Sequence, residues 1–180
     1  DKLIEFEKKS NVTIMESSGE LTPLKETYMN LLAYESCRQQ REAVVTALTP
    51  GLVLYGDTDW PVLWFKIPGL DYRGYASWDK ELPKIINATP IHINVSKIHF
   101  QTGGGPRIFE TLACGKLLIS NRIPAILDLF QEDYDLVFYD DIADLKDKVE
   151  YYTDHVEERE EIAYNGMQTV LANHTVMHRV

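Results

Sequence analysis

The sequence predicts an α/β domain in which helices cover both faces of a parallel β-sheet. Short apolar runs, each typical of a buried strand, alternate along the chain with helix-like segments. The chain has 180 residues, of which 44% are hydrophobic, and this suffices for one globular domain with a sizeable core. It contains no repeat and no apolar run of the roughly 20 residues that a transmembrane segment needs.

Threonine, proline and glycine delimit the first elements. After a charged leader or linker at residues 1–10, Asn11–Met15 is expected to form a short strand. Thr22-Pro23 is a typical helix start, and Thr49-Pro50-Gly51 is a typical stop for that helix. The apolar run Leu52–Tyr55 then predicts a buried strand.

The later elements alternate after a loop at 57–70 that is rich in tryptophan and proline. Strands are expected at 71–74, 91–95, 117–120 and 136–139, and helices at about 79–87, 106–114 and 124–130. From Asp141 onward we expect amphipathic helix in two or three pieces, broken near His155 and Asn173. The predicted domain therefore spans 11–172, and 173–180 is expected to form a C-terminal helix.

The net charge of −10 argues against a nucleic-acid-binding surface. The charge is uneven, however. Between Lys97 and Leu127 the only acid is Glu110, against four basic residues. A basic, glycine-rich window in an acidic chain indicates a local anion site, and a chance gap among solvated charges is the alternative.

Two cysteines, Cys37 and Cys114, are too few for a disulfide framework and lack metal-ligand spacing. No signal-peptide pattern opens the sequence. A reducing cytoplasm is the expected location. Because the chain begins at Asp1 rather than at methionine, we interpret it as a fragment of a longer protein.

Three consecutive glycines, Gly103–Gly105, fall between the predicted strand at 91–95 and the helix that begins near Pro106. In parallel α/β sheets, ligands bind beyond the carboxyl ends of the strands. Glycine lets backbone amides approach an anion, the helix N-terminus adds partial positive charge, and Arg107 offers a planar grip on phosphate. The stretch therefore predicts a diphosphate cradle, with a flexible loop before an ordinary helix as the alternative.

Glu110 follows Arg107 by about one helical turn. A carboxylate is a poor phosphate ligand but a good acceptor for two vicinal hydroxyls, such as those of a ribose. Glu110 is therefore a candidate ribose ligand, and a capping or solvent-facing glutamate is the alternative.

The segment R-I-F-E-T-L-A-C-G-K-L-L-I-S, Arg107 to Ser120, resembles the donor-binding segment of group 1 glycosyltransferases with the two-domain GT-B fold. More narrowly, it is similar to the CgeB-type, spore-maturation-like branch. Further matches follow in the family's order from about Leu52 to Arg179; they are Leu54–Gly56, Tyr72–Tyr75, Ile93–Val95 and His174–Arg179.

The resemblance implies that the chain is the C-terminal, Rossmann-like donor domain of a glycosyltransferase. The enzyme would move a sugar from a nucleoside diphosphate to an acceptor hydroxyl, and the acceptor would bind an N-terminal domain of the same full-length protein. The chain alone is expected to bind donor without turnover. The donor-binding residues implied are Gly56, Arg73, Tyr75, Gln101, Thr102, Gly103, Gly104, Gly105, Arg107 and Glu110, with Lys97 and His99 as further candidates. No catalytic residue is assigned.

One position departs from the pattern of related group 1 enzymes. These carry a second glutamate eight positions before the one that matches Glu110, where this chain has Thr102. The departure keeps open an alternative function, a non-catalytic module that uses the same fold to bind a nucleotide or a partner.

No metal cofactor is expected. Asp57-Thr58-Asp59 spells the Asp-x-Asp of metal-dependent glycosyltransferases of another fold, but aspartates after a strand commonly satisfy turn amides. The aromatic residues Trp60, Trp64, Trp78, Tyr72 and Tyr75 are expected mainly in the core. As an alternative, an aromatic ring between residues 72 and 78 would stack on the nucleobase.

Overall fold

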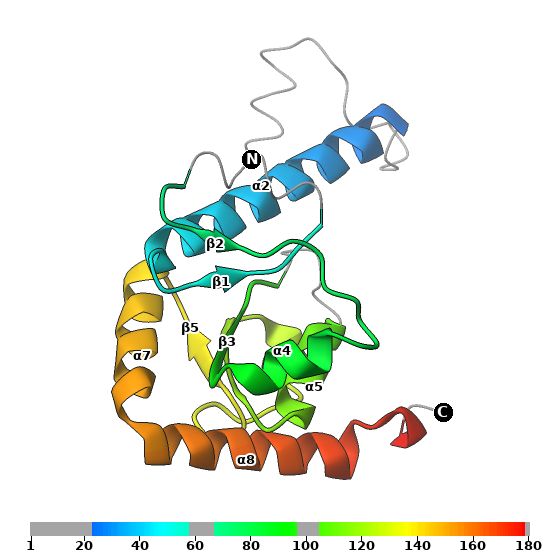
Figure 1. The fold of residues 1–180 in the computed structure, drawn as a ribbon. Coiled ribbons are helices and arrows are strands. Elements are labelled where there is room, and N and C mark those ends of the chain that lie inside the picture. The colour runs from blue at the N-terminus through cyan, green and yellow to red at the C-terminus, as the bar shows by residue number, and fades with distance from the viewer. Residues whose placement is uncertain (1–22, 58–66, 97–104, 179–180) are drawn as a thin grey trace. The chain divides into compact units, whose positions relative to one another are not determined.

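The structure, a computed structural model, describes residues 23–57, 67–96 and 105–178 (Figure 1). Helices and strands alternate along most of this length. The helices are α2 (Pro23–Leu48), α4 (Leu82–Ala88), α5 (Pro106–Ala113), α6 (Pro124–Leu127), α7 (Ile142–Asp154), α8 (Val156–Asn173) and the 3₁₀ turn η1 (Val176–His178). The strands are β1 (Val53–Leu54), β2 (Asp71–Tyr72), β3 (Ile91–Asn94), β4 (Leu117–Asn121) and β5 (Val137–Tyr139).

All strand pairs among the described residues are parallel. β3, β4 and β5 form a three-stranded sheet in that order, with Ile93 opposite Ile119 and Ile119 opposite Val137. β1 and β2 form a separate two-stranded pair, with Val53 opposite Asp71. Parallel strands place their carboxyl ends at one edge, where α/β proteins bind ligands.

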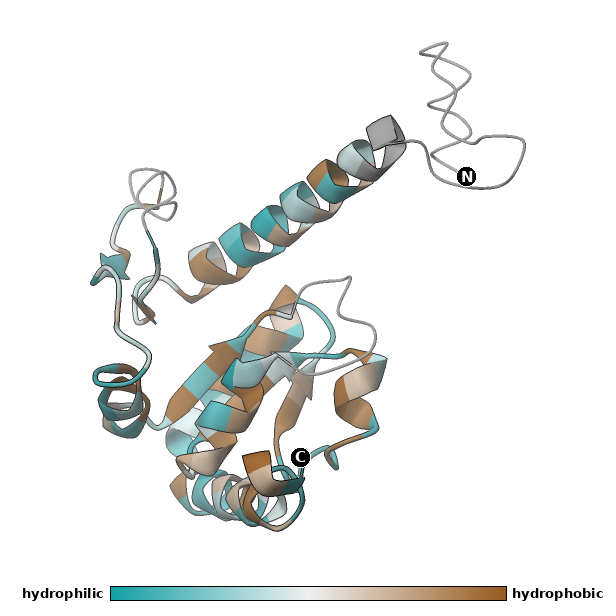
Figure 2. Ribbon diagram, turned by 90° about the vertical axis from the view of Figure 1, so that its right-hand side faces the viewer, coloured by the Kyte–Doolittle hydropathy of each residue, from teal (hydrophilic) through white to brown (hydrophobic). Residues whose placement is uncertain are grey.

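Alternate strand residues pack on opposite faces of the three-stranded sheet. Leu118 and Phe138 face a core formed with α5, α6 and α8, which includes Ile108 and Leu112. The odd-numbered strand residues, such as Ile119, face a second core formed with α7, the last turns of α2 and the start of α8. Figure 2 shows the apolar residues concentrated on these strands and on the sides of the helices turned toward them. The prediction of a parallel sheet with helices on both faces is confirmed.

A proline and a glycine fix the bounds of α5. Pro106 is its first residue, where the missing N–H costs no helical hydrogen bond. Gly115 ends it in the left-handed region at φ 63°, and its N–H donates to the carbonyl of Leu112 at 2.8 Å. The sequence predicted a helix at 106–114 that ends at this glycine, so the bounds agree within one residue.

Two predicted helices are shorter in the structure. The helix expected from Asp79 begins only at Leu82, because residues 78–81 form a turn held by Ser77 and Glu81. The helix expected over 124–130 ends at Leu127, and turns follow it. The strand predicted at 11–15 lies outside the described residues.

The chain divides into two compact units, residues 1–39 and 40–180, and α2 runs across the division. In the described part of the first unit, Glu35 pairs with Arg38 one turn later on α2. The domain limits predicted from the sequence, 11–172, stay a prediction. None of the helices among the described residues has the length and apolar character of a membrane span.

Helix α8 packs closely against the loop that precedes β5. The buried carboxylate of Asp135 accepts the hydroxyl of Thr169 at 2.6 Å and the N–H of Gln131 at 2.8 Å. Gly166, one turn before Thr169, lies so near this loop that a Cβ atom there would overlap with the carbonyl oxygen of Asp135. The glycine therefore sets how closely α8 approaches the sheet.

Candidate functional site

The first two turns of α5 carry the two charged side chains predicted to bind a nucleotide. Gly105 is the N-cap in an extended conformation, and its carbonyl accepts the N–H of Ile108 at 3.1 Å. Because glycine has no side chain, no side-chain cap engages the first-turn amides among the described residues, and such amides can bind water or a ligand. A helix start of this kind suits an anion.

Arg107 and Glu110 lie one turn apart on the same face of α5. Their side chains pair, with 3.2 Å between Nη1 of Arg107 and Oε2 of Glu110. The arginine side chain is 54% exposed and the glutamate side chain 21% exposed. The cation is thus accessible at the helix start, while the carboxylate is largely covered.

Trp78 covers Glu110 from outside the helix. It belongs to the turn before α4, and its indole N–H donates a hydrogen bond to Oε1 of Glu110. Trp78 is nevertheless 67% exposed, so the expectation of a core position is wrong for this residue. The alternative interpretation, in which an aromatic ring around residues 72–78 stacks on the nucleobase, was the signal that pointed away from the core; the stacking itself stays a prediction.

A second set of predicted residues lies at the ends of β1 and β2. The N–H of Gly56 donates to the carbonyl of Gly74 at 2.9 Å, and that of Arg73 donates to Leu54 at 2.9 Å. The hydroxyl of Tyr72 donates to the carbonyl of Asp57 at 2.8 Å. These bonds hold the connection after β1 against β2. Gly74 itself adopts φ 79°, which a residue with a side chain rarely tolerates.

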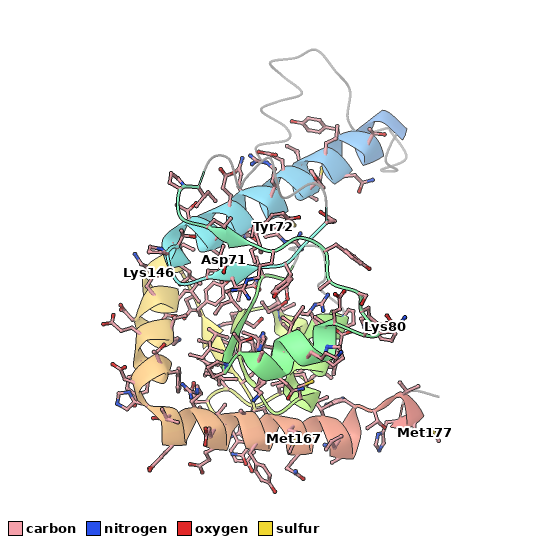
Figure 3. The ribbon with its side chains drawn as sticks, viewed as in Figure 1. Asp71, Tyr72, Lys80, Lys146, Met167 and Met177 are labelled. Atoms are coloured by element: carbon pink, nitrogen blue, oxygen red, sulfur yellow. The ribbon has the colours of Figure 1, made fainter. Side chains whose placement is uncertain are left out.

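Arg73, the residue after β2, is paired with the first residue of that strand. Its guanidinium lies 2.7 Å from the carboxylate of Asp71, and the hydrogen bond from Arg73 lowers the pKa of Asp71 below its usual value (Asp71 is labelled in Figure 3). Tyr75, 73% exposed, does not lie in the core, which corrects that expectation as well. Of the predicted site residues, Arg107 and Glu110 thus form an ion pair with each other. Gly56 hydrogen-bonds to Gly74, and Arg73 forms an ion pair with Asp71, which was not a predicted site residue.

Several predicted residues lie outside the described part of the chain. They are Lys97, His99, Gln101, Thr102, Gly103 and Gly104, together with Trp60, Trp64 and Asp59 of the Asp-x-Asp sequence. Among the described residues, no three histidine, cysteine, aspartate or glutamate side chains lie together as a metal site would require.

A polar network that was not predicted from the sequence lies at the carboxyl ends of β3 and β4. The amide of Asn94 donates to the hydroxyls of Ser96 at 2.8 Å and of Ser120 at 2.9 Å. The side chain of Asn121 accepts the N–H of Ser96 at 2.7 Å and donates to its carbonyl at 3.3 Å. Asn121 thus continues the β3–β4 pairing and fixes the chain where it leaves β3. Polar residues at the ends of apolar strands were the available signal.

Cys114 lies one turn after Glu110 at the end of α5. Burial, and after it the negative charge of Glu110, raises the pKa of the Cys114 thiol. A thiol with a raised pKa is mostly protonated at neutral pH and therefore a weak nucleophile. Cys114 and the buried Cys37 are both unbridged.

Comparison with known families assigns the chain. A family model described as glycosyl transferase-like matches residues 38–180. The chain belongs to this glycosyltransferase-like family. The match includes the β1–β2 ends and the α5 turn with Arg107 and Glu110. None of the curated proteins matches the sequence significantly.

Solved glycosyltransferase structures share the fold of this family member. HepE from Anabaena, crystallised with UDP-glucose, is 14% identical with a TM-score of 0.57, and the match covers 72% of this chain and 40% of HepE. The C-terminal domain of the group 1 protein LpcC from Francisella tularensis is 18% identical with a TM-score of 0.59, over 75% of this chain and 77% of LpcC. A glycosyltransferase from Rickettsia africae is 15% identical with a TM-score of 0.61, over 90% of this chain and 50% of that one.

These likenesses confirm the predicted fold class, the α/β fold of GT-B C-terminal domains. They also show that the chain spans about two fifths of the length of HepE.

Proposed function

We propose that the chain is the donor-binding half of a GT-B glycosyltransferase of the CgeB-type branch, and that it binds a nucleoside diphosphate sugar. The observation that carries the proposal is the pairing of Arg107 with Glu110 near the start of α5, 3.2 Å apart, in a member of a glycosyltransferase-like family. A cation for phosphate and an acceptor for hydroxyls thus lie side by side at a helix N-terminus.

The two ends of the ligand have different requirements. The diphosphate would bind the first-turn amides of α5 and the guanidinium of Arg107, both of which suit an anion. The ribose hydroxyls would donate to the carboxylate of Glu110. The UDP and UDP-glucose complexes of HepE support a nucleoside diphosphate as the ligand class.

The same residues would assist sugar transfer. As the bond from the sugar to the diphosphate breaks, negative charge grows on the leaving diphosphate. Preorganised amides and Arg107 would stabilise that charge where it develops. Because helix dipole and arginine supply the positive charge, the proposed reaction uses no metal ion. Donor binding alone is proposed for this chain, with acceptor binding in an N-terminal domain and the protein in the cytoplasm.

A thermal-shift panel with UDP, GDP and ADP, each with magnesium and with EDTA, tests the proposal. We expect at least one nucleotide to raise the melting temperature in both solutions. At 100 times its dissociation constant, it should add about 2.7 kcal/mol of stability. Stabilisation that EDTA abolishes would favour a metal at Asp57 and Asp59, and a response to none of the nucleotides would contradict donor binding.

A second candidate function rests on Thr102, which stands where related group 1 enzymes carry a glutamate. The chain would then be a non-catalytic nucleotide- or partner-binding module. Nucleotide binding does not separate the two candidates. Transfer or hydrolysis of a nucleotide sugar by the full-length protein would favour the enzyme, and binding without either reaction would favour the module.

Arg107 is expected to act on the diphosphate. Arg107→Ala should weaken binding of a nucleoside diphosphate about 10- to 100-fold, since a hydrogen bond to a charged group contributes about 1.5–3 kcal/mol. Arg107→Lys should recover only part of the loss, because lysine keeps the charge without the planar fork. Calorimetry with the diphosphate and the monophosphate of one nucleoside measures both effects.

The monophosphate provides the internal comparison. If Arg107 binds the diphosphate, its removal should reduce affinity for the diphosphate more than for the monophosphate. Lys146→Ala is a matched control, because Lys146 is an exposed cation on α7 (labelled in Figure 3). Equal losses for the two nucleotides would assign Arg107 to the fold or to the nucleoside end.

A further inference from the structure

Neither oxygen of the Glu110 carboxylate is open to a ligand. Oε1 accepts the indole N–H of Trp78. Oε2 is buried and has no hydrogen-bond partner among the described residues, although the guanidinium of Arg107 lies 3.2 Å away. A ribose presents two vicinal hydroxyls and needs accessible acceptor atoms for them. In this arrangement the diol cannot reach Glu110 until a neighbouring side chain moves.

The backbone around Trp78 is fixed, but its ring is not enclosed. The N–H of Ser77 donates to the carboxylate of Glu81 at 2.8 Å, and the N–H groups of Glu81 and Leu82 donate to the carbonyl of Ser77 at 3.1 and 3.0 Å. Figure 3 labels Lys80, which belongs to the same turn before α4. With two thirds of Trp78 exposed, its hydrogen bond to Glu110 is the interaction that a ligand would have to replace.

We propose that Trp78 competes with the donor for Glu110, so that a nucleoside diphosphate binds only when it displaces the indole. The proposal rests on the donor site proposed above. An indole N–H and a ribose O–H are both neutral donors to the same carboxylate, so one can replace the other. Arg107 stays beside Glu110 in this exchange, because its charge also suits the incoming phosphate.

Displacement lowers the apparent affinity. A ligand that binds only the open form has its affinity reduced by the fraction of molecules in that form. If the indole occupies Glu110 in about nine of ten molecules, the observed dissociation constant is about tenfold higher than that of the open site. Trp78 thus sets how much donor is needed to fill the site.

The test compares Trp78→Phe with the wild-type protein in calorimetric titrations with the nucleoside diphosphate that gives the largest thermal shift. Phenylalanine keeps an aromatic ring but lacks the N–H. We expect binding to tighten by about 3- to 10-fold, within the range that freeing the site allows. The ligand should also change the tryptophan emission of the wild-type protein, and this change should be lost in Trp78→Phe. Tyr164→Phe is the matched control, since Tyr164 is an exposed aromatic residue on α8 that is not among the predicted donor ligands.

A double variant separates competition from a general effect on the fold. In Glu110→Ala there is no carboxylate to contest, so adding Trp78→Phe should leave the affinity unchanged. Unchanged or weaker binding in Trp78→Phe alone would overturn the competition. Weaker binding would instead mean that the indole contacts the ligand or holds Glu110 in position.

If the proposed donor binding itself is wrong, the titrations should give a different result from a failure of the competition alone. In that case the wild-type protein would bind no nucleoside diphosphate, or would bind it equally well with and without Glu110. If wild-type binding depends on Glu110 and Trp78→Phe fails to tighten it, only the competition is wrong.

Discussion

Replacing Gly166 by alanine is expected to destabilise the domain by about 2–3 kcal/mol, because overpacking that forces a backbone shift typically costs 1–3 kcal/mol. The new Cβ would overlap with the carbonyl oxygen of Asp135 and would lie 3.0 Å from Cδ2 of Leu112. The carbonyl is backbone and cannot rotate away. Helix α8 must therefore move off the loop before β5, which also strains the hydrogen bond between Thr169 and Asp135.

The expected loss of stability is opposite in sign to the usual effect of replacing a helical glycine by alanine. In an unobstructed helix, glycine to alanine stabilises by about 0.8–1 kcal/mol. Chemical denaturation should show a loss for Gly166→Ala, and thermal melting should show a decrease of about 5 to 10 °C at this chain length. Gln168→Ala, at an exposed position of the same helix, is the control and should change stability little. A gain for Gly166→Ala would mean that α8 lies farther from the loop than described here.

The sequence was most informative where single residues terminate elements. Pro106 and Gly115 placed α5 within one residue, because a proline cannot continue a preceding helix and glycine favours the left-handed end. The predicted start of α4 was wrong for a related reason. Ser77 and Glu81 hydrogen-bond to each other within a turn, and a local side-chain bond of this kind competes with helix formation.

The charged residues of the site could be predicted from the sequence, but the side chain that contacts them from another part of the chain could not. Arg107 and Glu110 are three residues apart, so helical periodicity alone puts them on one face. Trp78 lies 32 positions before Glu110, and no local pattern relates the two. General preference placed this tryptophan in the core, since large aromatic rings are usually well buried. Trp78 departs from that preference, because its ring stays exposed while its N–H is engaged.

The contacts within the polar network of Asn94, Ser96, Ser120 and Asn121 could not be predicted for a different reason. The sequence shows polar residues at or just after the ends of β3 and β4, but their contacts depend on the register between the two strands. Periodicity within one strand shows which residues share a face of the sheet. It does not show which residue of the neighbouring strand lies opposite each of them.

Glu110→Ala is expected to weaken binding of a nucleoside diphosphate by about 10- to 100-fold, since each hydrogen bond to a charged group contributes about 1.5–3 kcal/mol. The substitution removes the acceptor for the ribose hydroxyls. It should leave the core intact, because Glu110 is not among the fully buried side chains that pack α5 on the sheet, such as Ile108 and Leu112. Calorimetry gives the affinity, and thermal melting without ligand checks the fold.

The structure predicts how the loss divides among variants of Glu110. Glu110→Gln keeps one acceptor oxygen at the same place but has no charge, so its affinity should fall between those of the wild type and alanine. Glu160→Ala, an exposed glutamate on α8, removes the same charge elsewhere and should bind normally.

The loss in Glu110→Ala should also be smaller than the ribose hydrogen bonds alone would give, because the wild-type protein must first release Trp78. Adding Trp78→Phe to a chain that retains Glu110 should therefore enlarge the apparent contribution of the glutamate. An affinity for the diphosphate that is the same with and without Glu110 would assign the residue a structural role, in which its carboxylate holds Trp78 and Arg107 against the start of α5.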